Sequence, residues 1–217
     1  MKERLHVTLI SNQKEYQNKL LNLKQDNDIL EIKEYGLSHD VPIIQDEGLV
    51  FLTMLLKIKK PVRILEIGSA IGYSAINMAR NCNAIIDTFE IKEESYNIAK
   101  ENIKKCGLED RINIYLGDAL ETFDIVKDNK YDFIFIDAAK AQYIKFFELY
   151  APLLNKDGII FTDNLYFHNL LFEEVSNRDL RGLVRKVGRY NDFLINNNDF
   201  ETHIFRIGDG IGVSIKK

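Results

Sequence analysis

Two aspartates and one asparagine follow two apolar stretches in the second half of the chain. Asp137 ends the stretch YDFIFID, and Asp163 and Asn164 end the stretch DGIIFTDN. Two carboxylates and an amide oxygen, completed by water and substrate oxygens, are ligands that suit an octahedral Mg²⁺. Taken singly, each side chain could instead cap a helix. Together, at neighbouring strand ends, they predict a magnesium site.

A cation at this position would bind a hydroxyl group and lower its pKa. Lys140 follows Asp137 by about one helical turn. Because a nearby cation makes the lysine ammonium easier to deprotonate, Lys140 is a candidate acceptor for the hydroxyl proton. Lys140 and Asp137 are therefore the predicted catalytic residues, and the predicted chemistry is the activation of a hydroxyl group beside a cofactor.

A glycine loop in the first half of the chain is the predicted cofactor site. The apolar run Ile64–Ile67 is followed by Gly68-Ser69-Ala70-Ile71-Gly72 and then by an amphipathic pattern, as in a strand, a tight turn and a helix start. The spacing G-x-x-x-G differs from the dinucleotide fingerprint G-x-G-x-x-G. Glu66 beside the loop would repel a pyrophosphate but suits an ammonium group, as in S-adenosylmethionine. A tight turn without a ligand is the alternative.

Two further acids follow the next two predicted strands. Glu90 stands 22 residues after Gly68, about the offset at which an acid binds ribose hydroxyls in nucleotide-binding βαβ folds. The alternative for Glu90 is an ordinary solvated strand end. Asp118 is placed equally well to recognise adenine or to cap the next helix. The loop before Glu90 favours ribose binding.

An arginine stripe is predicted on a helix near the C-terminus, at residues 178–196. Arg178, Arg181, Arg185 and Arg189 project onto one side of this helix, and Leu180, Leu183, Val187 and Leu194 project onto the opposite side. Most charged helix faces are simply solvated, but acids would normally intersperse them and are nearly absent here. Because arginine matches phosphate bidentately, the stripe is a candidate contact for a nucleic-acid backbone.

The elements that must position these residues alternate along the chain. Alternation of strands and helices predicts βαβ units and a parallel sheet covered on both faces. Strands are expected at 84–90, 111–117, 131–137 and 157–164, and helices at 92–106, from about Ala119 and from Ala141. Two last strands, 199–207 and 210–217, are joined by Gly208-Asp209-Gly210, which predicts an antiparallel hairpin.

Residues 1–60 are expected to form a helical cap on this sheet. Helical patterns cover residues 11–23, 26–37 and 46–57. Pro42 disfavours helix at Val41, so residues 41–44 should be extended. This segment either lies across a cofactor or only joins two helices.

Composition sets the remaining expectations. The 217 residues, 46% hydrophobic, can bury one core, and no linker divides them, so a single domain over residues 1–217 is expected. A net charge of −4 disfavours nucleic-acid binding over the whole surface but allows a local basic patch. No signal peptide or membrane span is recognised, and Cys82 and Cys106 suit free thiols, so a cytoplasmic location is expected. The scattered histidines are not interpreted as metal ligands.

The motifs LEIGSAIGYSA, TFE, GDAL, FIDAAK and FTDN resemble those of the cation-dependent class I O-methyltransferases, the catechol and caffeoyl-CoA type. This resemblance covers residues 41–217. Within that family, SHDVPI, DAAKAQY, DNLYFHNLL and the basic helix are most similar to the bacterial tRNA 5-hydroxyuridine methyltransferases. The implied fold is the Rossmann-like class I methyltransferase fold, a mostly parallel seven-stranded sheet with a C-terminal antiparallel hairpin and N-terminal helices.

The resemblance implies methyl transfer from S-adenosylmethionine to the hydroxyl of 5-hydroxyuridine in tRNA, with Mg²⁺ held by Asp137, Asp163 and Asn164, and it implies a homodimer. Around the cofactor it places Ile44, Gly68, Ser74, Glu90, Asp118, Ala119 and Asp137. O-methylation of small catechol-like or other phenolic compounds is the alternative. A non-catalytic protein that binds S-adenosylmethionine is a third hypothesis, and the intact metal set argues against it.

Overall fold

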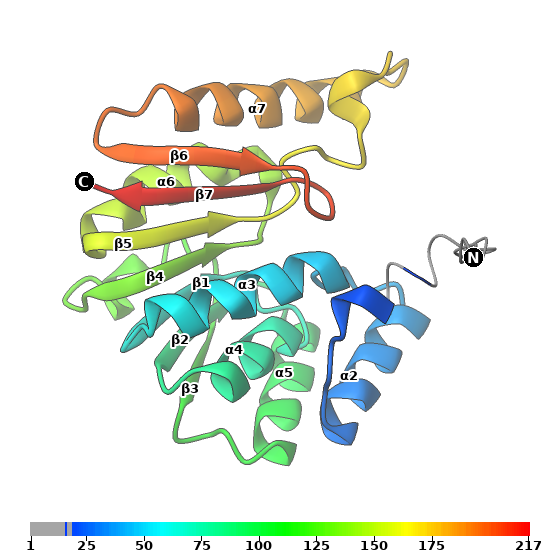
Figure 1. Ribbon diagram of the computed structural model, residues 1–217, viewed down its shortest axis with the longest axis vertical. Helices are drawn as coiled ribbons and strands as arrows, with labels where there is room; N and C mark the ends of the chain where they lie inside the picture. The colour runs from blue at the N-terminus through cyan, green and yellow to red at the C-terminus, as the bar shows by residue number, and fades with distance from the viewer. Residues whose placement is uncertain (1–15, 17–18) are drawn as a thin grey trace, which may run out of the picture.

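The computed structural model describes Tyr16 and residues 19–217. Its strands form one sheet in the order β3-β2-β1-β4-β5-β7-β6 (Figure 1). Pairing is parallel from β3 through β5, and β7 is antiparallel to both β5 and β6. The bounds are β1 Arg63–Ile67, β2 Ile85–Glu90, β3 Ile112–Leu116, β4 Tyr131–Ile136, β5 Leu154–Thr162, β6 Phe200–Phe205 and β7 Ile211–Lys216. The predicted fold class, including the antiparallel hairpin, is confirmed.

Helices cover both faces of the sheet, as the alternation of strands and helices predicts. The α-helices are α2 Asn27–Ser38, α3 Asp46–Lys59, α4 Tyr73–Asn81, α5 Glu93–Lys105, α6 Tyr143–Tyr150 and α7 Arg178–Ile195. Short 3₁₀ helices are η1 Phe123–Ile125, η2 Lys140–Gln142, η3 Ala151–Leu153 and η4 Leu170–Phe172. Helices α2 to α5 pack on one face and α6 and α7 on the other.

Side-chain alternation along β1 divides the core into these two layers. Ile64 packs in the cluster with α2, α3 and α4, whereas Leu65 and Ile67 pack in the cluster with α6 and α7. All three side chains are fully buried. A strand buried on both faces needs apolar side chains on both sides, and this is why the strand could be recognised in the sequence.

The strand order reverses between β1 and β4, where the chain leaves β3 and crosses to the other side of β1. Ligands in open α/β sheets bind at such a switch point, beyond the carboxyl ends of the strands. Gly68 follows β1 and Asp137 follows β4, and a Cβ on Gly68 would overlap the backbone carbonyl of Asp137. Glycine is therefore required where these two strands end.

The prediction of a helix from about Ala119 is wrong. Residues after β3 form a turn followed by the single 3₁₀ turn η1. Asp118 Oδ1 accepts from the backbone N–H of Leu120 at 2.9 Å, and Thr122 Oγ1 donates to the Asp118 carbonyl at 2.8 Å. Such local side-chain bonds to the backbone compete with helix formation.

The N-terminal helices mostly follow the prediction. α2 and α3 match the expected helices at 26–37 and 46–57, and residues 41–45 between them are extended. The helix expected at 11–23 falls largely outside the described residues. None of the helices described here is long and apolar enough to cross a membrane.

Candidate active site

A cavity of about 540 Å³ opens at the carboxyl ends of β1 to β5. Its walls come from the loops that follow these strands and from the extended residues Val41–Gln45, called the strap below. Many of the residues singled out in the sequence line it, namely Ile44, Gly68, Ser74, Glu90, Asp118, Ala119, Asp137, Lys140, Asp163 and Asn164. Strand topology thus brings the predicted cofactor and metal residues to one place.

The glycine loop is shaped to approach a ligand closely. Gly68 and Gly72 have φ angles of 100° and 83°, which residues other than glycine rarely adopt. Ser69 between them lines the cavity, and its Oγ is buried without a hydrogen-bond partner among the described residues. A buried hydroxyl without a partner is costly, so this atom marks a place for a polar ligand group.

Glu66 does not line the cavity, which corrects its expected position beside the cofactor. Its side chain is fully buried, where one oxygen accepts from Ser74 Oγ at 2.6 Å and the other from Thr88 Oγ1 at 2.5 Å. Burial raises the pKa of Glu66 to about 7, although the two hydroxyl bonds oppose this shift. Glu66 therefore fixes Ser74 of α4 and Thr88 of β2 behind the loop.

Glu90 ends β2 with its carboxylate at the cavity wall. One oxygen accepts from the backbone N–H of Ala70 at 2.8 Å, and the other accepts from that of Lys92 at 2.8 Å. The carboxylate is thus fixed by the glycine loop and by its own strand end. Each oxygen retains a lone pair, so Glu90 can still accept hydrogen bonds from a diol.

The acid pair, Asp137 and Asp163, follows β4 and β5, which lie on the other side of β1 from β2 in the sheet. Asp163 is 3% exposed, and burial together with the charge of Asp137 raises its pKa to about 7. Burial also raises the pKa of Asp137, while nearby Lys140 opposes this shift. Two carboxylates placed in this way disfavour each other's ionisation and would be relieved by a cation.

Asn164 and Lys140 complete this group. Lys140 Nζ donates to Asn164 Oδ1 at 2.8 Å, and Asn164 has a φ angle of 61°, in the left-handed region. Among the described residues no group of three or more His, Cys, Asp or Glu side chains is arranged to hold a metal ion. The predicted set has two carboxylates only, and its third oxygen belongs to the Asn164 amide.

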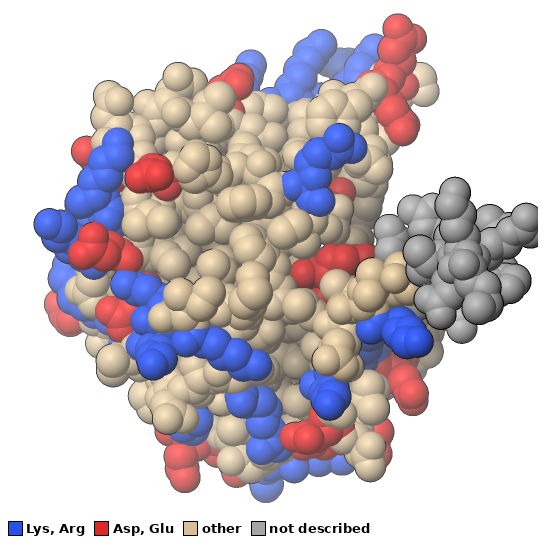
Figure 2. Space-filling model, viewed as in Figure 1, with Lys and Arg blue, Asp and Glu red and all other residues tan. Residues whose placement is uncertain are grey.

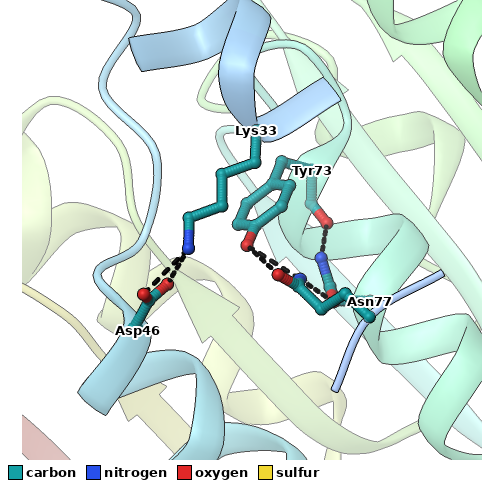
Figure 3. Close-up of polar contacts among 5 residues, drawn as sticks. Lys33, Asp46, Tyr73 and Asn77 are labelled. Atoms are coloured by element: carbon teal, nitrogen blue, oxygen red, sulfur yellow. Dashed lines mark hydrogen bonds and ion pairs between the residues drawn. The ribbon is translucent and has the colours of Figure 1, made fainter. Parts of the chain in front are cut away.

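Polar contacts join the helices beside the strap (Figure 3). Lys33 of α2 reaches Asp46, the residue that follows the strap, with an Nζ–Oδ1 distance of 2.6 Å. Tyr73, which lines the cavity, accepts from Gln25 Nε2 at 2.8 Å through its hydroxyl. The extended segment predicted around Pro42 therefore forms a wall of the cavity rather than a simple connection.

Two residues near the site were missed in the sequence. His168 lines the cavity, and Asp209 in the β6–β7 turn accepts from its backbone N–H. From the sequence, Gly208-Asp209-Gly210 predicts only a turn. Nothing in the sequence links this turn to His168, because Asp209 and His168 are 41 positions apart. The contact depends on the hairpin folding back along β5.

The predicted arginine stripe lies outside the cavity. Arg178, Arg181, Arg185 and Arg189 of α7 are all exposed, and Val187, Tyr190 and Leu194 of the same helix are buried. The ion pairs found in the described part of the chain involve none of the four arginines. Figure 2 shows basic side chains along the edge where α7 lies in Figure 1.

Comparisons with known proteins agree with this geometry. A flavonoid 3′,5′-methyltransferase of Vitis vinifera is 33% identical over 195 residues, which cover 85% of this chain and 81% of the relative. The crystal structure of a Staphylococcus aureus protein provisionally named a caffeoyl-CoA O-methyltransferase is 37% identical, with a TM-score of 0.89 over 94% of this chain and 99% of the other.

A second solved structure, an O-methyltransferase from Bacillus cereus in complex with SAH, is 25% identical. Its TM-score is 0.81 over 94% of this chain and 96% of the other. The sequence model of the O-methyltransferase family matches residues 29–217. This match spans every described strand and all the cavity residues, and the chain belongs to the O-methyltransferase family.

Proposed function

We propose that this O-methyltransferase takes its methyl group from S-adenosylmethionine bound between the glycine loop and the strap. The residues fit this cofactor, because Ser69 Oγ is buried in the cavity lining without a hydrogen-bond partner among the described residues and can bond to a polar ligand group. Glu90 would accept hydrogen bonds from the ribose hydroxyls, and Asp118 lines the cavity beyond it. The cofactor supplies an activated methyl group.

We further propose that Asp137, Asp163 and Asn164 hold Mg²⁺. The observation that carries this proposal is that Asp137, Asp163 and Asn164 line the cavity together, with Asp163 buried, and burial and the charge of Asp137 both raise the pKa of Asp163. Hard oxygen donors of this kind fit magnesium. When bound, the ion would supply a Lewis acid that lowers the pKa of a substrate hydroxyl.

Lys140 is the proposed proton acceptor for that hydroxyl. Its Nζ lies 2.8 Å from Asn164 Oδ1 at the edge of the same cavity. During transfer the methyl group would leave the cofactor sulfur, which keeps the bonding electrons, and bond to the substrate oxygen, and the hydroxyl proton would pass to Nζ in its neutral amine form. Asn164 orients the lysine for this transfer through its amide oxygen.

The proposed substrate is 5-hydroxyuridine in tRNA. Its 5-hydroxyl lies beside the O4 carbonyl oxygen, so the base offers two adjacent oxygens to one cation. The four exposed arginines of α7 support a tRNA rather than a free nucleoside, because they can bind phosphates along the backbone. This part of the proposal rests on the arginine stripe and on the resemblance of the motifs.

Small phenolic compounds with adjacent hydroxyls are the second candidate substrates. They offer the same pair of oxygens, and the flavonoid methyltransferase relative acts on such a ring according to its name. The cavity also has apolar walls, including Ile44, Ile67 and Phe146, which suit an aromatic ring. The catalytic chemistry would be identical for both substrate classes.

Mass spectrometry of tRNA nucleosides distinguishes the two candidates. Cells that lack this protein should accumulate unmethylated 5-hydroxyuridine and lose 5-methoxyuridine. Purified protein should restore the methyl group on tRNA from these cells when S-adenosylmethionine and Mg²⁺ are added. Unchanged nucleosides in the deletion strain, with turnover of catechols in vitro, would favour the small-molecule reaction.

A homodimer is also proposed, on the resemblance alone. Each chain has a mass of 25.2 kDa. Light scattering on the purified protein should give twice this mass. A mass equal to that of one chain at working concentration would exclude the dimer.

A further inference from the structure

Asp209 lies at the tip of the β6–β7 hairpin, and its carboxylate is directed inward. Its side chain is only 4% exposed, although it occupies a turn between Gly208 and Gly210. A buried carboxylate in a hairpin turn is unusual, because such turns normally expose their polar residues. The contacts of Asp209 explain why it is buried.

The β6–β7 turn holds the segment that follows β5, residues 163–169, in place. Asp209 Oδ1 accepts from the backbone N–H of His168 at 2.5 Å, and Oδ2 accepts from Asn164 Nδ2 at 3.4 Å. The Tyr166 N–H donates to the Asp209 carbonyl at 2.7 Å. A Cβ on Gly210 would lie 2.6 Å from Tyr166 Cγ, so the two segments pack without space for a side chain.

The clamped segment is strained. Phe167, His168 and Asn169 have successive φ angles of 47°, 55° and 63°, and Asn164 has one of 61°. The left-handed region is unfavourable for residues other than glycine, because their Cβ approaches the following carbonyl oxygen. Three successive residues persist in it only where their surroundings hold them, and the bond from His168 to Asp209 is one such contact.

The amide of Asn164 is held between opposite charges. Lys140 Nζ donates to its Oδ1, and its Nδ2 donates to the carboxylate of Asp209. Lys140 attracts the amide oxygen and Asp209 attracts the amide NH₂ group, so the two charges fix the orientation of the Asn164 amide. The oxygen is thereby directed to Lys140 and away from Asp209.

We propose that Asp209 is the positioning residue of the metal site, which holds the oxygen of Asn164 ready for the ion. This inference rests on the proposed Mg²⁺ site. Asp209 itself does not line the cavity, although Asn164 and His168, which it contacts, both do. It acts through Asn164, in the way that outer partners orient the ligands of a metal.

Replacement of Asp209 by Asn should misplace this oxygen. The variant turns one acceptor oxygen into an NH₂ donor. The His168 N–H keeps the remaining oxygen, so the NH₂ group faces Asn164 Nδ2, and two donors repel. Asn164 would then turn its own donor toward the ion site. We expect Asp209→Asn to weaken Mn²⁺ binding by about tenfold, measured by electron paramagnetic resonance on the full chain with S-adenosylmethionine.

A double-mutant cycle with Asn164→Ala separates positioning from simple loss of charge. This variant has no amide at position 164, so Asp209 has nothing to orient. In this background Asp209→Asn should change Mn²⁺ affinity by less than about twofold, and this non-additivity is the expected sign of coupling. An equal loss in both backgrounds would show that Asp209 acts through its charge and would overturn the proposal.

Asp209→Glu gives a second test that keeps the charge. It displaces the oxygens by one methylene, so positioning predicts weakened Mn²⁺ binding and a charge effect predicts parental affinity. Asp132→Asn is the matched control, since Asp132 accepts from the N–H groups of Val62 and Arg63 at the other end of the strands. It should leave Mn²⁺ affinity unchanged, and affinity for S-adenosylmethionine should remain parental in all variants.

A parent protein that binds no Mn²⁺ would refute the proposed metal site, and the role of Asp209 with it. Parental affinity in both Asp209 variants, beside a parent that does bind Mn²⁺, would refute the role of Asp209 alone. Failure of either variant to bind S-adenosylmethionine would show that Asp209 supports the fold in general and would also refute the positioning role.

Discussion

Glu66 and Glu90 end up in different environments although both belong to the carboxyl ends of neighbouring strands. Glu66 is enclosed by Ser74 and Thr88, and Glu90 is bound by two backbone N–H groups at the cavity wall. Residue type and position in the sequence suggested a similar role for both. The difference arises from position along the strand, because Glu66 lies one residue before the end of β1, whereas Glu90 is the last residue of β2 and reaches the backbone of the loops.

The stability of the protein should depend on the ionisation of Glu66. Its pKa is raised in the folded state from 4.5 to about 7, so its contribution is fully present below pH 4.5 and is lost as the pH rises through 7. Glu66→Gln removes this ionisation, and the Ser74 and Thr88 hydroxyls can bond to an amide. As the pH rises from 5 to 8, the free energy of unfolding of Glu66→Gln should come to exceed that of the parent by up to about 3 kcal/mol.

Urea denaturation of both proteins at the two pH values measures this difference. Near pH 5 the two should have similar free energies of unfolding. Parallel pH dependence in parent and variant would mean that Glu66 is not buried as an acid. The same test on Glu93→Gln, at an exposed position of α5, should show no such divergence.

Glu90→Ala should weaken binding of S-adenosylmethionine. Charge-assisted hydrogen bonds to the ribose are worth roughly 1.5–3 kcal/mol each, so the loss should be about tenfold or more. Calorimetry with the metal-free protein measures it directly. Glu93→Ala removes a neighbouring acid that does not line the cavity and should bind the cofactor normally. Unchanged affinity in Glu90→Ala would remove Glu90 from the cofactor site.

At the level of single elements, α7 has one buried side and one exposed side. Its buried residues Val187, Tyr190 and Leu194 attach it to the sheet, and its Asn177 cap accepts from the N–H groups of Asp179 and Leu180. The opposite side is free to carry the arginines. A helix held so firmly can present these side chains in a fixed line.

Replacing Arg181 and Arg185 together by alanine should weaken tRNA binding and flatten its salt dependence. Each lost phosphate contact should reduce the slope of log K against log salt by roughly 1. Methylation of a small phenol should be much less affected. Lys57→Ala with Lys60→Ala removes the same charge from exposed positions at the end of α3 and is the control. Identical salt slopes for the arginine variant and the parent would leave the stripe as a solvated face.

The elements were predictable to different degrees, for physical reasons. Ile64, Leu65 and Ile67 could be recognised as a strand because β1 is buried on both faces, and periodicity revealed α7 because one of its sides faces solvent. The segment after Asp118 has no such regularity, and its turn depends on local side-chain bonds that a helical pattern does not reveal. The strap at residues 41–45 was found through Pro42, but its contact with the cavity depends on tertiary packing.

In the molecule as a whole, the predicted catalytic and binding residues lie at one edge of the sheet. Strand ends far apart in the sequence meet there, which is why Asp137, Asp163 and Glu90 could be assigned to one site before any coordinates. The hairpin that brings Asp209 to Asn164 could not be assigned in this way, because nothing in the sequence indicates how far the turn folds over β5. The predicted cofactor residues follow β1, β2 and β3, and the acid pair follows β4 and β5, so the two groups line different parts of one cavity.

The proposal that Asp137 and Asp163 hold a metal ion needed for methyl transfer can be tested by removing the ion or one of the acids. The measurement is transfer of labelled methyl from S-adenosylmethionine to tRNA that carries 5-hydroxyuridine, and to a catechol, with Mg²⁺ or with EDTA. With either substrate, chelation should stop turnover, and Asp163→Ala should abolish it while cofactor binding stays close to parental. Full turnover in EDTA, or an active Asp163→Ala variant, would contradict the account.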